Sequence, residues 1–247
     1  MTVFGSVGAF ALLLLAAVVV FILLRRKAAE IVGWLEKHLP PGFPARTLVI
    51  SALALAAAGA FTAVAGEVVE HETSAFDLSV GAAIHGLASP AMDFTMRLLT
   101  AMGSPEVIVV AVALALFDTS RRRDRRATWS LAAVSTAAGV FNWLLKTLIG
   151  RARPAPFGEL SALHSYSFPS GHAMTATAIY GMIGVVLARE HPQWRTALAI
   201  AIPTLVVLIG LSRIYLGVHW PTDVIAGWAA GMTLVLVGLA VLVLRRE

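Results

Sequence analysis

Long apolar runs alternate with short polar or basic stretches along most of the 247-residue chain. Backbone polar groups in lipid are satisfied only in helices or closed barrels, and these runs are too long for barrel strands. The run 105–118 is short for a span, so Ala101 and Met102 or local thinning of the bilayer must help it. The pattern predicts an all-α integral membrane protein with seven candidate spans: 2–24, 46–66, 105–118, 128–149, 169–188, 196–211 and 222–244.

Two stretches between these runs are predicted to lie outside the bilayer. Residues 28–45 carry several charges before a Pro-Pro-Gly turn, which indicates a short amphipathic helix and a turn. Residues 67–104 form the longest polar stretch, and it begins with Glu67, Glu70, His71 and Glu72. Carboxylates and a histidine can ligate a metal. No second matching cluster follows, so a solvated helix end at the membrane surface is the better interpretation.

The composition agrees with a membrane protein and excludes some chemistry. Hydrophobic residues make up 58% of the chain and charged residues 13%, whereas an average soluble domain has about 25% charged residues. The absence of cysteine excludes disulfides, a thiol nucleophile and thiolate metal sites. The net charge of +5 does not indicate a nucleic-acid partner, because the basic residues cluster between apolar runs as they do in cytoplasmic loops.

The distribution of Lys and Arg over the two predicted sides fixes the expected orientation. The positive charge after the run 2–24, rather than before it, favours an uncleaved anchor over a signal peptide. One side holds 14 basic residues and is therefore predicted to be cytoplasmic: Arg25, Arg26, Lys27, Lys37, Arg46, Arg121, Arg122, Arg123, Arg125, Arg126, Arg189, Arg195, Arg245 and Arg246. The other side holds five, namely Arg97, Lys146, Arg151, Arg153 and Arg213.

One polar stretch, 212–223, places charged residues between two apolar runs. Such residues are costly at the edge of the hydrocarbon layer and indicate a functional site. Pro221 suits the first turn of a helix, where its missing N–H would be unbonded anyway. If the helix starts near Trp220, His219 and Asp223 lie one turn apart on one face. Asp223 can then hold one ring nitrogen of His219 and leave the other as a nucleophile, unless the pair only caps the helix.

Lys146 and Arg153 lie on the same predicted side as that stretch. Their spacing of seven residues corresponds to two helical turns, so we expect both on nearly one face of a helix that Pro154 ends. Arginine can hold phosphate oxygens through two parallel N–H bonds, and lysine adds a compact charge. The pair predicts an anion site, with snorkelling at the membrane surface as the alternative.

The segment Pro169–Ser170–Gly171–His172 opens a helix on this same side. Free N–H groups at a helix N-terminus attract an anion. Gly171 allows close approach of the anion, and Ser170 adds a hydroxyl donor. With Arg213, the predicted outer face collects three cations, helix-end donors, two histidines and one aspartate. This inventory suits a dianionic group.

The three motifs resemble the signature of the type-2 phosphatidic acid phosphatase superfamily, also called the lipid phosphate phosphatase or acid phosphatase/vanadium haloperoxidase superfamily. All signature positions are filled, in Lys146–x6–Arg153–Pro154, Pro169–Ser170–Gly171–His172 and Ser212–Arg213–x5–His219–x3–Asp223. The resemblance extends over 46–244 and implies a core of six transmembrane helices, to which 2–24 adds one. We therefore expect an N-terminal membrane anchor helix with a cytoplasmic linker in 1–45 and a phosphatase membrane domain in 46–247.

The resemblance also implies a role for each motif residue. His219 is expected to be the nucleophile that takes the phosphoryl group, Asp223 its orienting partner, and His172 the general acid that later activates water. The expected phosphate-binding residues are Lys146, Arg153, Ser170, Gly171 and Arg213. The family needs no metal or other cofactor. Fixed cations and helix-end N–H groups can by themselves stabilise charge that develops on a transferring phosphoryl group.

The expected function is hydrolysis of a lipid phosphate or diphosphate at the outer face of the plasma membrane, with the lipid substrate and membrane lipids as partners. Family analogy favours undecaprenyl diphosphate, with phosphatidylglycerophosphate, phosphatidate and diacylglycerol diphosphate as alternatives. An anion transporter is a rival, but its charges should lie near the midplane among broken helices. A vanadate-dependent haloperoxidase would share the anion site, although its relatives are soluble.

Overall fold

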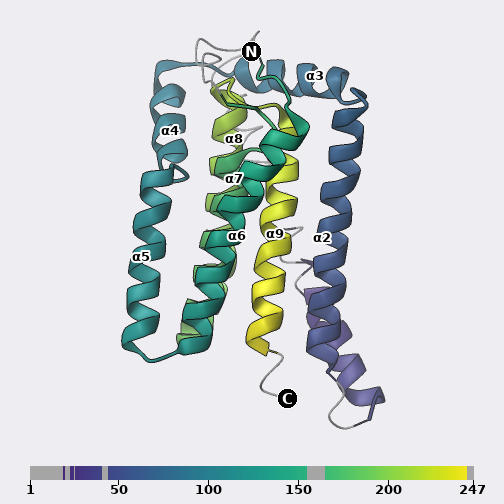
Figure 1. Ribbon diagram of the computed structural model, residues 1–247, viewed down its shortest axis with the longest axis vertical. Coiled ribbons are helices and arrows are strands. Elements are labelled where there is room, and N and C mark those ends of the chain that lie inside the picture. Colours follow the sequence, from purple (N-terminus) through teal and green to yellow (C-terminus); the bar gives the residue numbers. More distant parts are fainter. Residues whose placement is uncertain (1–18, 20–22, 25, 41–43, 155–164, 244–247) are drawn as a thin grey trace.

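The computed structural model describes residues 19, 23–24, 26–40, 44–154 and 165–243. Within these ranges the regular structure is helical, with no strand, and Figure 1 shows long helices packed side by side in a bundle. The predicted run 2–24 lies almost wholly outside the described residues. Residues 26–38 are helical, as expected for the segment that follows that run.

Six spans account for the bundle if one bent pair of helices is counted as a single span. Five helices are long and apolar enough to cross a membrane, and α4 and α5, bent by 44° at their junction, pass the same test together. The elements are α2 (Ala45–Val69), α3 (Ser74–His85), α4 (Pro90–Ala101), α5 (Pro105–Arg121), α6 (Arg125–Ile149), α7 (Gly171–Glu190), η3 (Pro192–Trp194), α8 (Arg195–Tyr215) and α9 (Pro221–Val243).

The polar stretch 67–104 contains two helices, α3 and α4, which the sequence pattern does not predict. Both α4 and α5 begin with a Ser-Pro pair in which the serine hydroxyl accepts a backbone N–H and the proline occupies the first turn. Helix α5 extends to Arg121, three residues beyond the predicted run 105–118, and it passes the test for a span together with α4.

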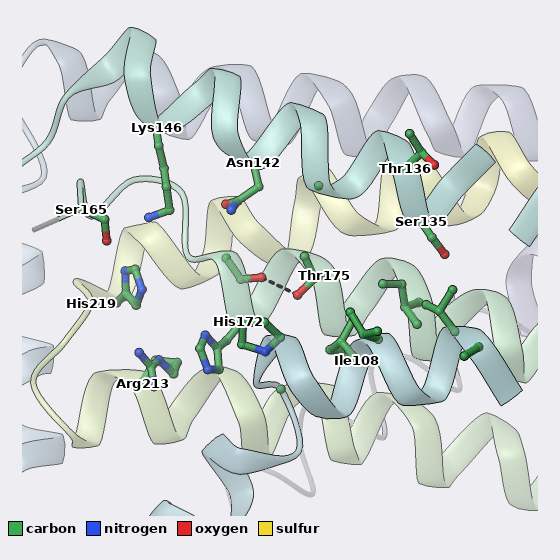
Figure 2. Close-up of a pocket in the computed structure, with 18 of the residues that line it drawn as sticks. Ile108, Ser135, Thr136, Asn142, Lys146, Ser165, His172, Thr175, Arg213 and His219 are labelled. Carbon is green, nitrogen blue, oxygen red and sulfur yellow. Dashed lines mark hydrogen bonds between the residues drawn. The ribbon is translucent and has the colours of Figure 1, made fainter. Parts of the chain in front are cut away.

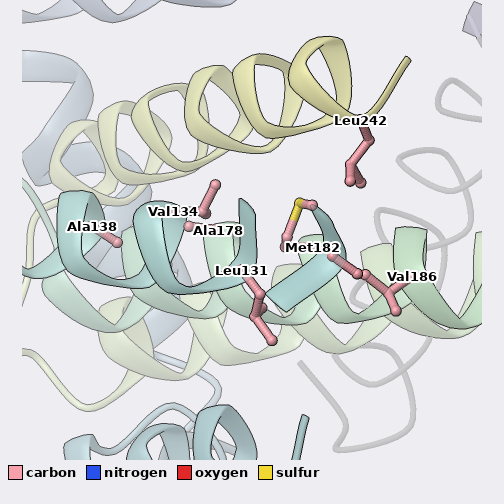
Figure 3. Packing of buried hydrophobic residues seen from close by; sticks show 8 residues of the cluster. Leu131, Val134, Ala138, Ala178, Met182, Val186 and Leu242 are labelled. Carbon is pink, nitrogen blue, oxygen red and sulfur yellow. The ribbon is translucent and has the colours of Figure 1, made fainter. Parts of the chain in front are cut away.

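The core is centred on α7. In the 18-residue apolar stretch of α7, 56% is buried inside the protein, whereas the corresponding share in α2 is 6%. Most of α2 is therefore left to face lipid. Figure 3 shows one cluster to which α6, α7 and α9 all contribute side chains. Its buried members are Ala127, Leu131, Val134, Ala138, Ala178, Met182, Val186 and Leu242. This packing fixes the positions of α6, α7 and α9, which carry Lys146, Gly171, His172 and Asp223.

The two ends of the bundle differ in their polar groups. At the lower end in Figure 1, the α5–α6 loop meets the α7–α8 turn. There Arg122 contacts Glu190 at 3.1 Å, and Arg189 pairs with Asp124. The three motifs lie at the opposite end, which α3 crosses. This separation agrees with the two-sided distribution of charge predicted from the sequence.

Candidate active site

A cavity of about 710 Å³ opens between α5, α6 and α7 and joins all three motifs. Its polar end is lined by Lys146, Arg153, Gly171, His172, Arg213 and His219. Figure 2 shows Lys146 projecting from α6 toward His219 and Arg213, with His172 beside them. The predicted site residues are therefore brought together, with Ser170 adjacent to Gly171 and Asp223 behind His219.

Arg153 reaches this cavity from an irregular segment and not from a helix face. Helix α6 ends at Ile149 because Gly150 adopts a left-handed conformation, with φ of 63°. The prediction that Lys146 and Arg153 share one helix ended by Pro154 is thus wrong. Arg153 is held instead by acceptors of two loops: it donates to Val218 O at 2.6 Å, to Ser165 O at 2.8 Å and to Ser165 Oγ at 2.9 Å. Lys146 lies on α6 and donates to the carbonyl of Tyr166.

His219 and Asp223 adopt the arrangement expected from their spacing. Helix α9 begins at Pro221, and His219 Nδ1 lies 3.4 Å from Asp223 Oδ2. Because Nδ1 faces the carboxylate, Nε2 is the ring nitrogen left for the cavity. Burial lowers the pKa of His219 to about 4, although the Asp223 carboxylate opposes this shift. The ring is therefore neutral at neutral pH, as a nucleophile must be.

Asp223 has more partners than the sequence predicts. Its Oδ1 accepts from Arg151 Nη1 at 2.6 Å. Its Oδ2 accepts from the backbone N–H of Trp220 at 2.8 Å and from the Ser167 hydroxyl. Arg151 was counted in the sequence only as an outer positive charge. Asp77, which binds Arg151 through Oδ2 at 2.6 Å, was not singled out at all.

The N-terminus of α7 lies at the cavity, which Gly171 and His172 line. Ser170 occupies the N-cap position without a side-chain capping bond. Its buried hydroxyl finds no hydrogen-bond partner among the described residues. Its backbone N–H donates to Asp223 O at 2.9 Å, which ties the start of α7 to α9. The helix-end N–H groups and this hydroxyl together form a site suited to an anion.

Arg213 lies in the last turn of α8, which continues to Tyr215, four residues beyond the predicted end of that span. Its Nη1 donates to Thr100 Oγ1 of α4 at 2.6 Å. Its buried Nε has no partner among the described residues. Helix α4 also accepts a 2.5 Å hydrogen bond from Tyr215 through Asp93. The part of the chain predicted to be a surface stretch thus helps to position a cation of the site.

The cavity continues from its polar end into an apolar groove between α5, α6 and α7. Helix α5 lines this part with Ile108, Val109, Val112, Ala113 and Leu116. Figure 2 shows Ile108 and Ser135 at the end of the groove away from Lys146 and His219. The same cavity can therefore hold an anionic group at one end and an alkyl or prenyl chain along the other.

Such a fold and site define a helical integral membrane protein with a cavity lined by basic residues at one end of its bundle. A model of the PAP2 superfamily matches residues 127–247. The chain belongs to this superfamily.

The chain is similar to phosphatases of known name. It is 40% identical over 98 residues to "Phosphatidylglycerophosphatase B" of Bacillus subtilis, which covers 38% of this chain and 48% of that protein. It is 34% identical over 148 residues to "Decaprenylphosphoryl-5-phosphoribose phosphatase" of Mycobacterium tuberculosis, which covers 58% of this chain and 77% of that protein. The chain thus spans about half the length of the first relative and about three quarters of the second.

A solved structure extends the likeness to three quarters of the chain. The crystal structure of a transmembrane PAP2-type phosphatidylglycerolphosphate phosphatase from Bacillus subtilis superimposes with a TM-score of 0.70. The two sequences are 26% identical, and the match covers 75% of this chain and 94% of that one. The predicted fold class, a helical membrane protein of the phosphatase type, is confirmed.

Proposed function

We propose that this protein is an integral-membrane phosphatase that hydrolyses the phosphomonoester or diphosphate head group of a lipid through a phosphohistidine intermediate. The observation that carries this proposal is the continuity of one cavity, with three cations and two histidines at one end and an apolar groove at the other. A soluble phosphate ester would leave the groove empty. A lipid phosphate fills both ends.

In the proposed reaction, Nε2 of His219 attacks phosphorus and the bond from phosphorus to the leaving oxygen breaks. His172 gives a proton to that oxygen, so the lipid leaves as an alcohol or a monophosphate. His172 then takes a proton from water, which attacks the phosphohistidine and releases inorganic phosphate. Asp223 holds Nδ1–H of His219 throughout and balances the charge that forms on the ring.

The phosphoryl group is stabilised by fixed charges. Arg153, Lys146 and Arg213 surround the position that it must occupy, and the start of α7 adds N–H donors and the Ser170 hydroxyl. Such preorganised donors act strongly where water is excluded, and they can replace the charge of a metal ion in phosphoryl transfer. We therefore propose that turnover requires no metal.

Among lipid phosphates, we propose a polyprenyl carrier such as undecaprenyl diphosphate. The mycobacterial relative, whose name specifies a decaprenyl lipid, supports this class. The Bacillus relatives support phosphatidylglycerophosphate as the second candidate. The apolar groove accommodates either tail, so the head group and chain type must be separated by assay.

We further propose a plasma-membrane location with the site on the extracytoplasmic face. The basic residues at the end opposite the motifs support this orientation. Residues 1–45 are proposed to act as an anchor and linker, and 46–247 to carry the chemistry.

The test is phosphate release by the purified protein from a lipid panel in detergent, with EDTA present. The panel contains undecaprenyl diphosphate, phosphatidylglycerophosphate, phosphatidate and diacylglycerol diphosphate, and His219→Ala serves as the blank. We expect release with at least one lipid and the largest kcat/KM with undecaprenyl diphosphate. Release that disappears in EDTA, or that equals the His219→Ala blank with every lipid, would contradict the proposal.

A further inference from the structure

We infer that Asp77 and Arg151 are positioning residues for the proposed reaction, because one guanidinium joins both carboxylates and so fixes the aspartate that holds His219. The inference rests on the proposed function in taking His219 as the nucleophile. It assigns a role in the chemistry to α3, a helix that carries none of the three motifs.

The connection is direct and short. Arg151 Nη1 lies 2.6 Å from Asp223 Oδ1, and Arg151 Nη2 lies 2.6 Å from Asp77 Oδ2. Asp77 and Asp223 are 1% and 0% exposed, so both carboxylates are removed from water. A buried carboxylate left without its cation is strongly disfavoured, so each of the three groups, Asp77, Arg151 and Asp223, depends on the other two.

Asp77 also holds the backbone that carries Asp223. Its Oδ1 accepts the N–H of Thr222 at 2.9 Å, and its Oδ2 accepts the Thr222 hydroxyl at 2.7 Å. Thr222 is the second residue of α9, where backbone N–H groups lack partners within the helix. Asp77 therefore caps α9 from a neighbouring helix. The first turn of α9, including Asp223, is fixed relative to α3.

Neither residue of the pair lies where the phosphate is proposed to bind. Asp77 and Arg151 are absent from the lining of the 710 Å³ cavity and line a second cavity of about 450 Å³ on the other side of Asp223. Arg153, only two residues further along, lines both cavities. Arg151 thus acts on the reaction through Asp223, whereas Arg153 can touch the phosphoryl group itself.

The charges explain why a second carboxylate is needed. When His219 takes the phosphoryl group, its ring becomes cationic and requires the full negative charge of Asp223. A guanidinium paired with Asp223 alone would neutralise that charge. Because Asp77 takes the other side of the Arg151 guanidinium, part of the negative charge of Asp223 remains for the imidazole. Loss of Asp77 should therefore slow the chemical steps without weakening substrate binding.

The first test measures kcat and KM for lipid phosphate release by full-length Asp77→Asn and Arg151→Lys. We expect kcat to fall at least about tenfold in each and KM to stay within about twofold of wild type, since an interaction made only in the transition state changes kcat. Arg189→Lys is the matched control, because it alters an ion pair with Asp124 at the opposite end of the bundle. An increase in KM at unchanged kcat would instead make Arg151 a phosphate ligand and overturn the inference.

A double variant separates positioning from general stability. If Asp77 acts through Asp223, then Asp77→Asn should cost little further kcat in an Asp223→Asn background, because coupled residues are not additive. Multiplication of the two losses would mean that Asp77 acts independently of Asp223, and the inference would fail. Thermal unfolding of each variant in detergent, compared with Arg189→Lys, shows whether the protein remains folded.

A third readout does not need turnover. The ring of His219 is followed by NMR of histidine-labelled protein during a pH titration. Asp77→Asn should lower the pKa of that ring, because the Arg151 charge then falls wholly on Asp223; an unchanged titration would contradict the inference. A wild-type protein that releases no phosphate from any lipid counts against the proposed function, whereas active wild type with unaltered Asp77→Asn counts against this inference alone.

Discussion

Asn142 of α6 lies directly against Gly171 at the start of α7. A Cβ atom at position 171 would stand 3.1 Å from Asn142 Nδ2 and 3.3 Å from its Oδ1, closer than a normal van der Waals contact. The buried Oδ1 of Asn142 has no hydrogen-bond partner among the described residues. Asn142 is four residues before Lys146, so the two side chains lie on one face of α6. The two helices thus approach closely beside the proposed phosphate site.

This contact predicts that Gly171→Ala impairs the enzyme. The added methyl group must displace Asn142 or the first turn of α7, and either shift misplaces donors of the phosphate site. We expect kcat/KM to fall at least about tenfold, or ~1.4 kcal/mol. Asn142→Ala in the same chain should restore part of this loss by making room. Measuring kcat/KM for Gly171→Ala, Asn142→Ala and the double variant checks this prediction. An active Gly171→Ala would show that the close approach does not matter for catalysis.

Arg153→Lys is predicted not to be a conservative change. Arg153 uses three N–H bonds to hold Ser165 and Val218, which leaves others of its five for a phosphate. A lysine cannot make both sets of contacts. We expect a loss of at least ~1.4 kcal/mol in kcat/KM, or tenfold. Arg97→Lys, an exposed change on α4, is the control and should retain wild-type kinetics. Equal kinetics for the two variants would reduce Arg153 to a surface anchor.

The two histidines are predicted not to be interchangeable. His219 has the carboxylate that fixes its tautomer, whereas His172 lies at the N-terminus of α7. His219→Ala should therefore abolish both turnover and phosphoenzyme. His172→Ala should still form some phosphoenzyme from a substrate with an activated leaving group, because such a group needs less protonation. Rapid quench with labelled substrate measures the adduct, which should be acid-labile, alkali-stable and attached at His219. An adduct retained in His219→Ala would assign the nucleophile elsewhere.

The lowered pKa of His219 predicts the response to acid. Only the neutral ring can attack, and its pKa of about 4 means that it is still neutral well below the ordinary value of 6.5. We expect the acid limb of kcat/KM to lie near pH 4, with little loss between pH 7 and pH 5. A pH series with wild-type enzyme, corrected for thermal unfolding at each pH, measures it. An acid limb near pH 6.5 would show that His219 titrates as an exposed imidazole.

The proposed orientation predicts the labelling of two serine-to-cysteine variants in this cysteine-free chain. Ser79 on α3 and Ser120 at the end of α5 are both exposed and lie at opposite ends of the bundle. In intact cells, an impermeant thiol reagent should label Ser79→Cys and should label Ser120→Cys only after lysis. The reverse pattern would place the motif end in the cytoplasm.

Much of the fold and of the site could be predicted from the sequence, for a physical reason. The bilayer requires long apolar helices, so runs such as 128–149 and 222–244 identify spans directly. Each motif lies at the end of such a run, and counting the runs places all three motifs on one side. The meeting of Lys146, His172 and His219 around one cavity confirms that counting.

The supporting residues could not be predicted, because nothing local marks them. Asp77 and Arg151 are 74 residues apart in the sequence. They meet because α3 packs against the start of α9. Helix α3 is short, and its few polar positions resemble those of a surface loop. The end of α6 is different, because the sequence does mark it. Gly150, with Pro154 four residues further on, is a helix stop signal. The seven-residue spacing of Lys146 and Arg153 favours one continuous helix, but the helix ends at the glycine.

The segment between Gly150 and Pro154 has a consequence for how the protein tolerates change. Arg151 donates to Asp223, whereas Arg153 lines the cavity that holds His219, and only Ala152 separates the two arginines. The side chain of Ala152 is exposed, while its carbonyl accepts the indole N–H of Trp220 at 3.0 Å. Many side chains should therefore be acceptable at position 152. An insertion or a deletion there should not be, since either would move Arg151 or Arg153 away from its partners. Ala152 matters as a spacer of fixed length, and its identity is nearly free.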